Sequence, residues 1–214
     1  MTCPCCQGYE DTFDTGTAEG DLRDYRRHGP DKTTRLLIEA LKTFGIEGQS
    51  LLDIGGGVGV IQHELLKSGA TSATHVDASS AYLQAAKQEA ERQGHADRVH
   101  QFHGDFVALA PQIPQADIVT LEKVICCYPD MNALVGLSAA RAARLYGVVF
   151  PRDTWWWKIG GRVANLFLRL QRSSFRIFVH PTDGVEAVVR RNGLERRYYR
   201  RTLIWQIVVY ARTG

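Results

Sequence analysis

Residues 51–60 read LLDIGGGVGV, an apolar run that ends in a cluster of glycines. Such a run is typical of a buried parallel strand that leads through a tight turn into a helix, because glycine lets the backbone approach a ligand closely. The dinucleotide fingerprint G-x-G-x-x-G does not fit here in any frame, and no Gly-Lys-Ser/Thr follows that would make a phosphate-binding loop. The pattern that does fit is D-x-G-x-G-x-G, formed by Asp53, Gly55, Gly57 and Gly59.

Strand-like and helix-like segments alternate on both sides of the glycine cluster. Helices are predicted at 30–44, 58–68, 80–93 and from residue 131 onward. Strands are predicted at 50–54, 73–77, 99–103, 117–121 and 147–150. A series of this kind builds a parallel sheet with helices on both faces, so ligands are expected at the carboxyl ends of the strands.

The C-terminal part breaks this alternation. Segments 194–201 and 203–212 are consecutive strand-like runs with almost nothing between them, so they predict an antiparallel hairpin. The predicted fold is therefore α/β, a doubly wound, mostly parallel sheet of seven strands with a C-terminal antiparallel hairpin. With the glycine motif, this ending resembles the class I S-adenosylmethionine-dependent methyltransferases over about residues 30–212. The resemblance implies a Rossmann-like sheet, S-adenosylmethionine as the cofactor and transfer of its methyl group.

Two acidic residues at strand ends are candidate ligands of the nucleoside. Asp77 ends the strand at 73–77, where a carboxylate can accept hydrogen bonds from both ribose hydroxyls, and Ala78 follows it. Asp105 and Phe106 resemble the family segment that places a carboxylate near the adenine amino group and an apolar side chain on the adenine face. The alternatives are a solvated aspartate at a strand end and a plain turn with a buried phenylalanine.

The resemblance also assigns roles within the glycine motif. Asp53 is expected to orient the glycine loop and the amino group of the methionine moiety. A Cβ at Gly55 or Gly57 would push the cofactor away from the backbone, and Gly59 completes the cofactor-binding motif. The alternative is a glycine turn that only the fold requires.

The exit of the fourth predicted strand carries further candidates. Residues 117–130 read DIVTLEKVICCYPD, and reacting groups gather at such a strand end. Glu122 is expected among the cofactor-binding residues and Tyr128 among the catalytic ones, both beside the transferred methyl group. This run and FVHP at 178–181 show a weaker resemblance to the magnesium-protoporphyrin O-methyltransferases.

His180 is the candidate general base, because an imidazole can take a proton from a hydroxyl nucleophile near neutral pH. The alternative is a structural histidine that forms a hydrogen bond before Pro181.

The five cysteines predict free thiols and no metal site, and the alternative is a soft metal held by the N-terminal C-x-C-C cluster. Cys3, Cys5 and Cys6 lack the fourth ligand of a closed zinc site, and an odd count argues against a disulfide framework. Cys126 and Cys127 are expected to be buried thiols. An arsenic-methylating function would instead need the two cysteine groups to converge on the site.

A predicted helix at 154–172 has more apolar surface than an ordinary surface helix. Its polar residues recur at helical spacing on one narrow stripe, which consists of Lys158, Arg162, Asn165, Arg169 and Arg172. Two things could cover the apolar remainder: the domain itself, with 154–180 inserted as a lid over the cofactor, or the headgroup layer of an anionic membrane. Either predicts an apolar or aromatic small-molecule acceptor, with acidic groups that the arginines recognise.

Composition sets the remaining expectations. With 214 residues, 44% hydrophobic and 23% charged, the chain predicts one soluble globular domain. The resemblance implies that residues 30–214 form a methyltransferase domain, preceded by a segment at 1–29 that is flexible or folds over the cofactor. The net charge of +3 is too small to indicate nucleic acid as a partner. No apolar run reaches the roughly 18 to 20 residues of a membrane span, and no signal-peptide pattern is seen, so we expect a cytoplasmic protein.

The predicted function is S-adenosylmethionine-dependent methylation of an apolar or aromatic small molecule, with oxygen as the expected acceptor atom. Two other classes stay open. The first is an NAD-dependent reductase, which Val60 disfavours because the fingerprint needs glycine at that position. The second is a noncatalytic module that binds S-adenosylmethionine without transferring its methyl group.

Overall fold

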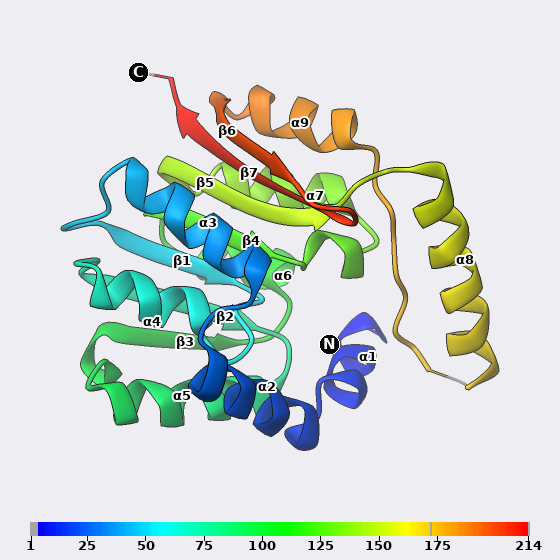
Figure 1. The fold of residues 1–214 in the computed structure, drawn as a ribbon, viewed down its shortest axis with the longest axis horizontal. Helices are drawn as coiled ribbons and strands as arrows, with labels where there is room; N and C mark the ends of the chain where they lie inside the picture. Colours follow the sequence, from blue (N-terminus) through cyan, green and yellow to red (C-terminus); the bar gives the residue numbers. More distant parts are fainter. Residues whose placement is uncertain (1–3, 172, 214) are drawn as a thin grey trace.

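The computed structural model describes residues 4–171 and 173–213, with side chains from residue 8 onward. Cys3 and Arg172 lie outside the described residues, as do the side chains of Cys5 and Cys6. Within this part of the chain, a seven-stranded sheet crosses the molecule and carries helices on both faces (Figure 1).

The sheet has the predicted architecture. Its strands are β1 (Ser50–Ile54), β2 (Ser72–Asp77), β3 (Val99–His103), β4 (Ala116–Glu122), β5 (Ala142–Pro151), β6 (Leu194–Arg201) and β7 (Trp205–Arg212). They lie in the order β3-β2-β1-β4-β5-β7-β6, with β1 to β5 parallel and β7 antiparallel to both of its neighbours. The fold class is confirmed. Strand β5 is longer than the predicted 147–150, because residues 142–146 extend its pairing with β4.

Helices complete the layers. They are α1 (Pro4–Thr12), α2 (Thr15–His28), α3 (Lys32–Thr43), α4 (Val60–Lys67), α5 (Ser80–Gln93), α6 (Phe106–Leu109), α7 (Met131–Ala139), α8 (Trp155–Leu170) and α9 (Thr182–Arg191). The side chains of successive residues in a strand point to opposite faces of the sheet. Leu51 of β1 packs in the core with Leu41 and Leu65 of α3 and α4, whereas Leu52 packs in the core with Leu134 and Val188 of α7 and α9.

In Figure 1, helix α2 lies at the bottom of the view beside α5, and α1 lies to the upper right of α2. Helix α2 is fastened to α5, since Arg26 Nε lies 2.8 Å from Glu89 Oε2 and Tyr82 Oη donates to Asp21 Oδ2 at 2.5 Å. The sequence patterns do not predict this helix, whose buried residues are only Ala18, Leu22 and Tyr25.

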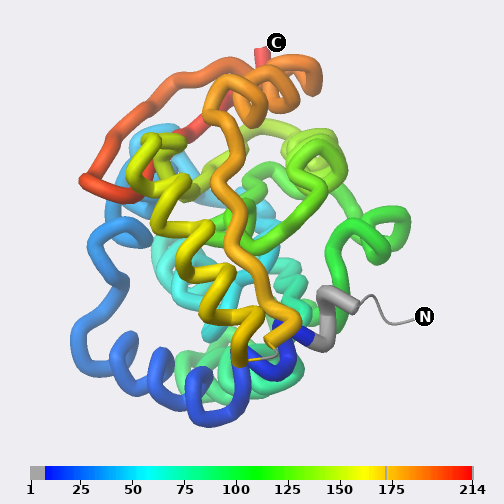
Figure 2. Tube along the Cα trace, turned by 90° about the vertical axis from the view of Figure 1, so that its right-hand side faces the viewer, coloured from blue at the N-terminus to red at the C-terminus, as the bar shows by residue number. Residues whose placement is uncertain are grey.

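Helix α8 leaves the end of β5, and residues 173–181 return beside it as an extended strap (Figure 2). Asn165 holds the strap, because its side chain donates to Ile177 O at 2.7 Å and accepts from Ile177 N at 2.8 Å. Asn165, which the sequence places on the polar stripe of this helix, is therefore half-buried against the strap. The outer apolar residues of α8 are not covered by the described chain, and Trp155 and Leu170 are 74% and 72% exposed. Trp156, Trp157 and Leu168 are half-buried.

Candidate functional site

A cavity of about 720 Å³ lies at the carboxyl ends of β1, β2 and β4, next to the point where the strand order reverses. Its floor consists of the glycine loop (54–58), the end of β2 (76–78), residues 104–106 and the exit of β4 (122–124 and 127–128). The predicted site residues on its wall are Gly55, Gly57, Asp77, Ala78, Asp105, Phe106, Glu122 and Tyr128. Asp53, Gly59 and His180 are not on the wall that the described residues form.

Asp77 is held beside the glycine loop by two backbone hydrogen bonds. Its Oδ2 accepts from Gly57 N at 3.0 Å and its Oδ1 accepts from Ser79 N at 2.8 Å. Each carboxylate oxygen keeps further acceptor capacity, because a carboxylate offers about four lone-pair positions. The geometry leaves Asp77 free to receive hydroxyl donors from the cavity.

The glycines of the motif have different steric surroundings. A Cβ built at Gly57, where φ is +56°, would meet nothing nearer than Tyr82 Cε1 at 3.9 Å. A Cβ at Gly55 would meet Val124 Cγ2 at 2.5 Å, and one at Gly59 would press on Gln62 and on His63 Nε2 at 3.0 Å. The protein itself therefore excludes side chains at Gly55 and Gly59, whereas Gly57 leaves open space toward the cavity.

Asp53 lies beneath the glycine loop and is 1% exposed. Its Oδ1 accepts from Thr120 Oγ1 at 2.7 Å, and burial raises the pKa of its carboxyl group. A Cβ at Gly56 would come within 2.7 Å of Asp53 Oδ2 and 2.9 Å of His75 Nε2, so the loop backbone closes directly over these two side chains. The structure separates Asp53 from the cavity by this backbone.

Asp105 and Tyr128 are joined by a hydrogen bond on the cavity wall. Asp105 caps α6 by accepting from Val107 N at 3.0 Å, and its Oδ2 accepts from Tyr128 Oη at 2.9 Å. Burial and the neighbouring Asp105 raise the pKa of Tyr128, so its phenol is protonated at neutral pH. Phe106 is 4% exposed and packs in the main core while its edge borders the cavity.

Glu122 is bound by the first turn of α3. Its Oε1 accepts from Thr34 Oγ1 at 2.5 Å and from Thr33 Oγ1 at 3.2 Å, and Lys123 Nζ lies 3.4 Å away. Burial raises the pKa of Glu122. Lys123 also pairs with Asp31, the residue that caps α3.

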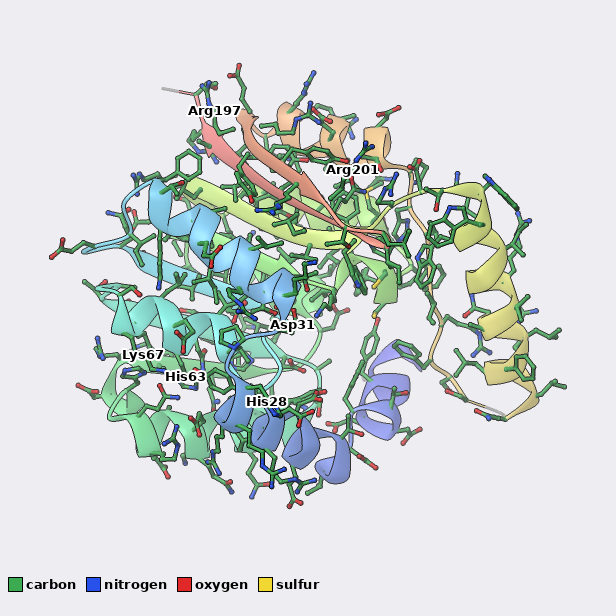
Figure 3. All side chains as sticks on the ribbon, viewed as in Figure 1. His28, Asp31, His63, Lys67, Arg197 and Arg201 are labelled. Atoms are coloured by element: carbon green, nitrogen blue, oxygen red, sulfur yellow. The ribbon has the colours of Figure 1, made fainter. Side chains whose placement is uncertain are left out.

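Several wall residues have no individual role in the sequence interpretation, which leaves open only that the segment 1–29 folds over the cofactor. They come from α1, α2, the start of α3 and the turns between these helices, and they are Tyr9, Phe13, Asp21, Asp24, Tyr25, His28, Asp31, Thr34 and Arg35. Figure 3 labels His28 and Asp31 where α2 gives way to α3. One sequence signal could have indicated these helices. Asp14 and Asp31 cap α2 and α3, and aspartate at such a position marks the start of a helix, here before the first strand.

His180 supports the exit loop of β4 from outside the cavity. Its Nε2 lies 2.9 Å from the carbonyl oxygen of Tyr128, to which it donates, and its ring stacks on Phe178 at 5.9 Å. Phe178 N donates to Cys126 O at 2.7 Å, so the strap is attached to this loop at two points. This is the structural arrangement that the sequence left as the alternative for His180.

The two central cysteines lie in the same loop. Their sulfur atoms are 3.8 Å apart, Cys126 is buried, and Cys127 borders the cavity. Among the residues that the structure describes, no three histidine, cysteine, aspartate or glutamate side chains form a group that could hold a metal ion.

Part of the sequence matches a known protein family and curated proteins. Residues 51–144 match the family described as methyltransferase domain. Ribosomal protein L11 methyltransferase from Enterobacter sp. (strain 638) is 29% identical over 126 residues, which are 54% of this chain and 42% of the relative. The protein of the same name from Escherichia coli (strain K12 / DH10B) is 28% identical over 130 residues, 56% of this chain and 43% of that protein. The match thus spans less than half the length of these curated relatives.

Solved structures agree in fold across nearly the whole chain. Magnesium protoporphyrin IX methyltransferase from Synechocystis PCC 6803, with bound SAH, has a TM-score of 0.74 at 18% identity, and the match covers 95% of this chain and 98% of that one. An O-methyltransferase family protein from Burkholderia thailandensis has a TM-score of 0.68 at 17% identity, covering 96% of this chain and 63% of the other. The sheet order, the glycine motif and these likenesses together show the fold of the class I S-adenosylmethionine-dependent methyltransferases, and residues 51–144 match the methyltransferase domain family.

Proposed function

We propose that this protein transfers the methyl group of S-adenosylmethionine to an oxygen of a small apolar or aromatic molecule. The observation that carries the proposal is the cavity of about 720 Å³, where the glycine loop, Asp77, Asp105, Phe106 and Tyr128 meet. Pockets of this size enclose most of a drug-sized ligand. Oxygen as the acceptor atom is supported by the fold likeness to the O-methyltransferase family protein from Burkholderia thailandensis.

The wall residues fit this cofactor. Asp77 has acceptor capacity for the ribose hydroxyls, and Gly57 leaves space for a nucleoside to lie against the backbone. Asp105 and Phe106 are assigned to the adenine, as an acceptor and an apolar surface. Ala78 and Glu122 border the same volume. Asp53 lies directly beneath the loop, and Gly55 and Gly59 let the loop pack closely against the protein.

The chain's contribution to the chemistry is alignment and exclusion of water. When bound, S-adenosylmethionine supplies an electrophilic methyl group. Tyr9, Phe13 and Tyr25 border the cavity from α1 and α2 and limit the access of water. Among the described wall residues the only histidine is His28, whose imidazole can take the proton of a hydroxyl acceptor. We therefore place the general base at His28 instead of His180, with Tyr128 as a donor held by Asp105.

The acceptor is proposed to carry an acidic group. Arg35 and Lys123 are the cations on the described cavity wall, and guanidinium groups suit carboxylates. The surrounding aromatic residues suit an apolar body. A lipophilic carboxylic acid satisfies both requirements.

A protein acceptor is the second candidate, because the curated relatives are ribosomal protein methyltransferases. The two candidates are separated by incubating the protein with S-adenosylmethionine labelled at its methyl group and a cell extract. Label in lipophilic small molecules supports our proposal, whereas label only in protein overturns it. Cofactor binding without any transfer indicates the noncatalytic module, and binding of NADH in place of S-adenosylmethionine indicates the reductase.

His28→Gln tests the assigned base. With a hydroxyl acceptor the rate of transfer falls on the order of a hundredfold, because general-base catalysis of this kind contributes about 10² or more. Binding of S-adenosylmethionine, measured by calorimetry, is unchanged. His180→Gln is the control, and an equal loss of rate in both variants, or none in His28→Gln, contradicts the assignment.

Two variants separate contact with the cofactor from packing within the protein: Gly57→Ala tests the contact and Gly59→Ala tests the packing. Alanine at Gly57 costs only the left-handed backbone strain of about 1 to 2 kcal/mol, yet lowers the affinity for S-adenosylmethionine by tenfold or more, on the order of 1.4 kcal/mol. Alanine at Gly59 meets the buried Gln62 and His63, so it destabilises the fold more than Gly57→Ala does. Thermal unfolding without cofactor and calorimetry with it measure the two effects. Normal cofactor affinity in Gly57→Ala would refute the contact.

A further inference from the structure

The outer side of α8 presents an apolar face to solvent. This face comprises Trp155, Ile159, Val163, Leu166, Phe167 and Leu170, all between 49% and 74% exposed. At 3.6 residues per turn, these six positions occupy an arc of about 120° along the helix. Contiguous exposed apolar surface of this kind marks an interaction site, since leaving it in water is unfavourable.

Positive charge lies directly beside the apolar face. Lys158, Arg162 and Arg169 are exposed and occupy the adjoining arc, and α8 contains no acidic residue. The β6–β7 turn extends the same surface, because Arg152 N donates to Ile204 O at 2.8 Å next to the start of α8. That turn carries Leu203, which is 75% exposed.

The hairpin adds further cations near this turn. Arg200 and Arg201 are exposed at the end of β6. Figure 3 labels Arg201 on the side of the hairpin toward α8 and Arg197 at its far end. Apolar and basic residues therefore continue from α8 onto the neighbouring turn.

We infer that α8 docks this protein on the surface of an anionic lipid bilayer, with the apolar face in the headgroup layer and the basic residues against lipid phosphates. A helix with an apolar arc bordered by Lys and Arg has the composition of a helix that lies in the plane of an interface. Among the described residues, none of the helices combines the length and apolar character needed to span a bilayer. A second copy of the chain is disfavoured as the occupant, because it would bring the same cations and no acidic residue of α8 to the contact.

The docking surface is connected to the cavity. The strap fastened to Asn165 on the inner side of α8 is bonded through Phe178 and His180 to the carbonyls of Cys126 and Tyr128. These carbonyls belong to the loop that walls the cavity. A bilayer at α8 therefore lies beside the site, where a lipophilic acceptor would be concentrated.

The test is co-sedimentation of the purified protein with vesicles of phosphatidylcholine alone or with about 30% phosphatidylglycerol, compositions that differ in surface charge. Leu166→Ser/Phe167→Ser removes apolar surface, and Arg162→Gln/Arg169→Gln removes charge. Lys42→Gln/Lys87→Gln is the matched control, since both lysines are exposed on helices remote from α8 in Figure 1. All the exchanged side chains are exposed, and calorimetry with S-adenosylmethionine verifies that each variant keeps its site.

The parent protein and the lysine control are expected to bind the anionic vesicles and not the neutral ones. Each α8 variant should bind on the order of tenfold more weakly, in line with the contribution of buried apolar groups and interfacial cations. Absence of binding to anionic vesicles overturns the inference, and so does binding that both α8 variants retain. A concentration-dependent dimer that Leu166→Ser/Phe167→Ser abolishes would assign the face to a second copy and likewise overturn it.

Discussion

Asp77→Ala is expected to weaken binding of S-adenosylmethionine by about 1.5 to 3 kcal/mol, or roughly 10- to 150-fold, the cost of losing hydrogen bonds to a charged acceptor. The carboxylate is held by Gly57 N and Ser79 N with its remaining lone pairs toward the cavity, so alanine removes both the ligand group and a support of the glycine loop. Calorimetric titration with S-adenosylmethionine and with S-adenosylhomocysteine measures the loss.

Asp97→Ala provides the comparison for this variant. Asp97 is exposed in the short helix Ala96–Arg98 and is not on the cavity wall. Its replacement should leave both affinities unchanged. Unaltered affinity for S-adenosylmethionine in a folded Asp77→Ala protein would contradict the proposal that Asp77 binds the ribose. The membrane inference would not be affected, because vesicle binding tests it separately.

The second large expected effect is a loss of folding stability at acidic pH, which is caused by the buried side chain of His63. This side chain is fully buried, its ring stacks between Tyr25 at 6.5 Å and His95 at 5.6 Å, and the Nδ1 atoms of the two histidines are 3.4 Å apart. Burial and His95 lower the pKa of His63 from 6.5 to about 4. The folded protein therefore keeps His63 neutral at pH values where the unfolded chain binds a proton.

The sign of the pH dependence follows from this difference. The contribution of neutral His63 to stability is complete above pH 6.5, declines as the pH falls from 6.5 to about 4, and changes no further below that. Since one pKa unit corresponds to about 1.4 kcal/mol, the free energy of unfolding drops by about 3 kcal/mol over this interval. Glu89, whose pKa its partners Arg92, Gln93 and Arg26 lower to about 2, adds a loss of stability at pH below 4.5.

His63→Gln isolates this contribution, because an amide does not titrate. Urea unfolding at a series of pH values should show that most of the decline between pH 6.5 and about 4 disappears. The control His100→Gln changes an exposed histidine of β3 and should retain the parent's pH dependence. A His63→Gln protein whose stability still falls by about 3 kcal/mol over that interval would contradict the explanation.

Much of the candidate site could be predicted from the sequence because its signals are local. The carboxyl ends of neighbouring parallel strands meet at one edge of a sheet, so Asp77, Asp105 and Glu122 converge once the strands are correctly identified. The same rule could not place His180. Its position depends on how the strap returns beside α8, which is decided by Asn165 and Phe178 through contacts with distant segments.

The sequence by itself determined the seven-strand α/β fold, the glycine turn and the strand-end acids, because hydrophobic period, glycine content and chain order act between near neighbours. Only the tertiary structure decided that α1 and α2 wall the cavity, that His28 lies on that wall, and that α8 faces solvent. Helical periodicity shows which side of a helix is apolar, but what covers that side depends on segments far away in the chain. Such long-range contacts leave no local pattern in the residues that make them.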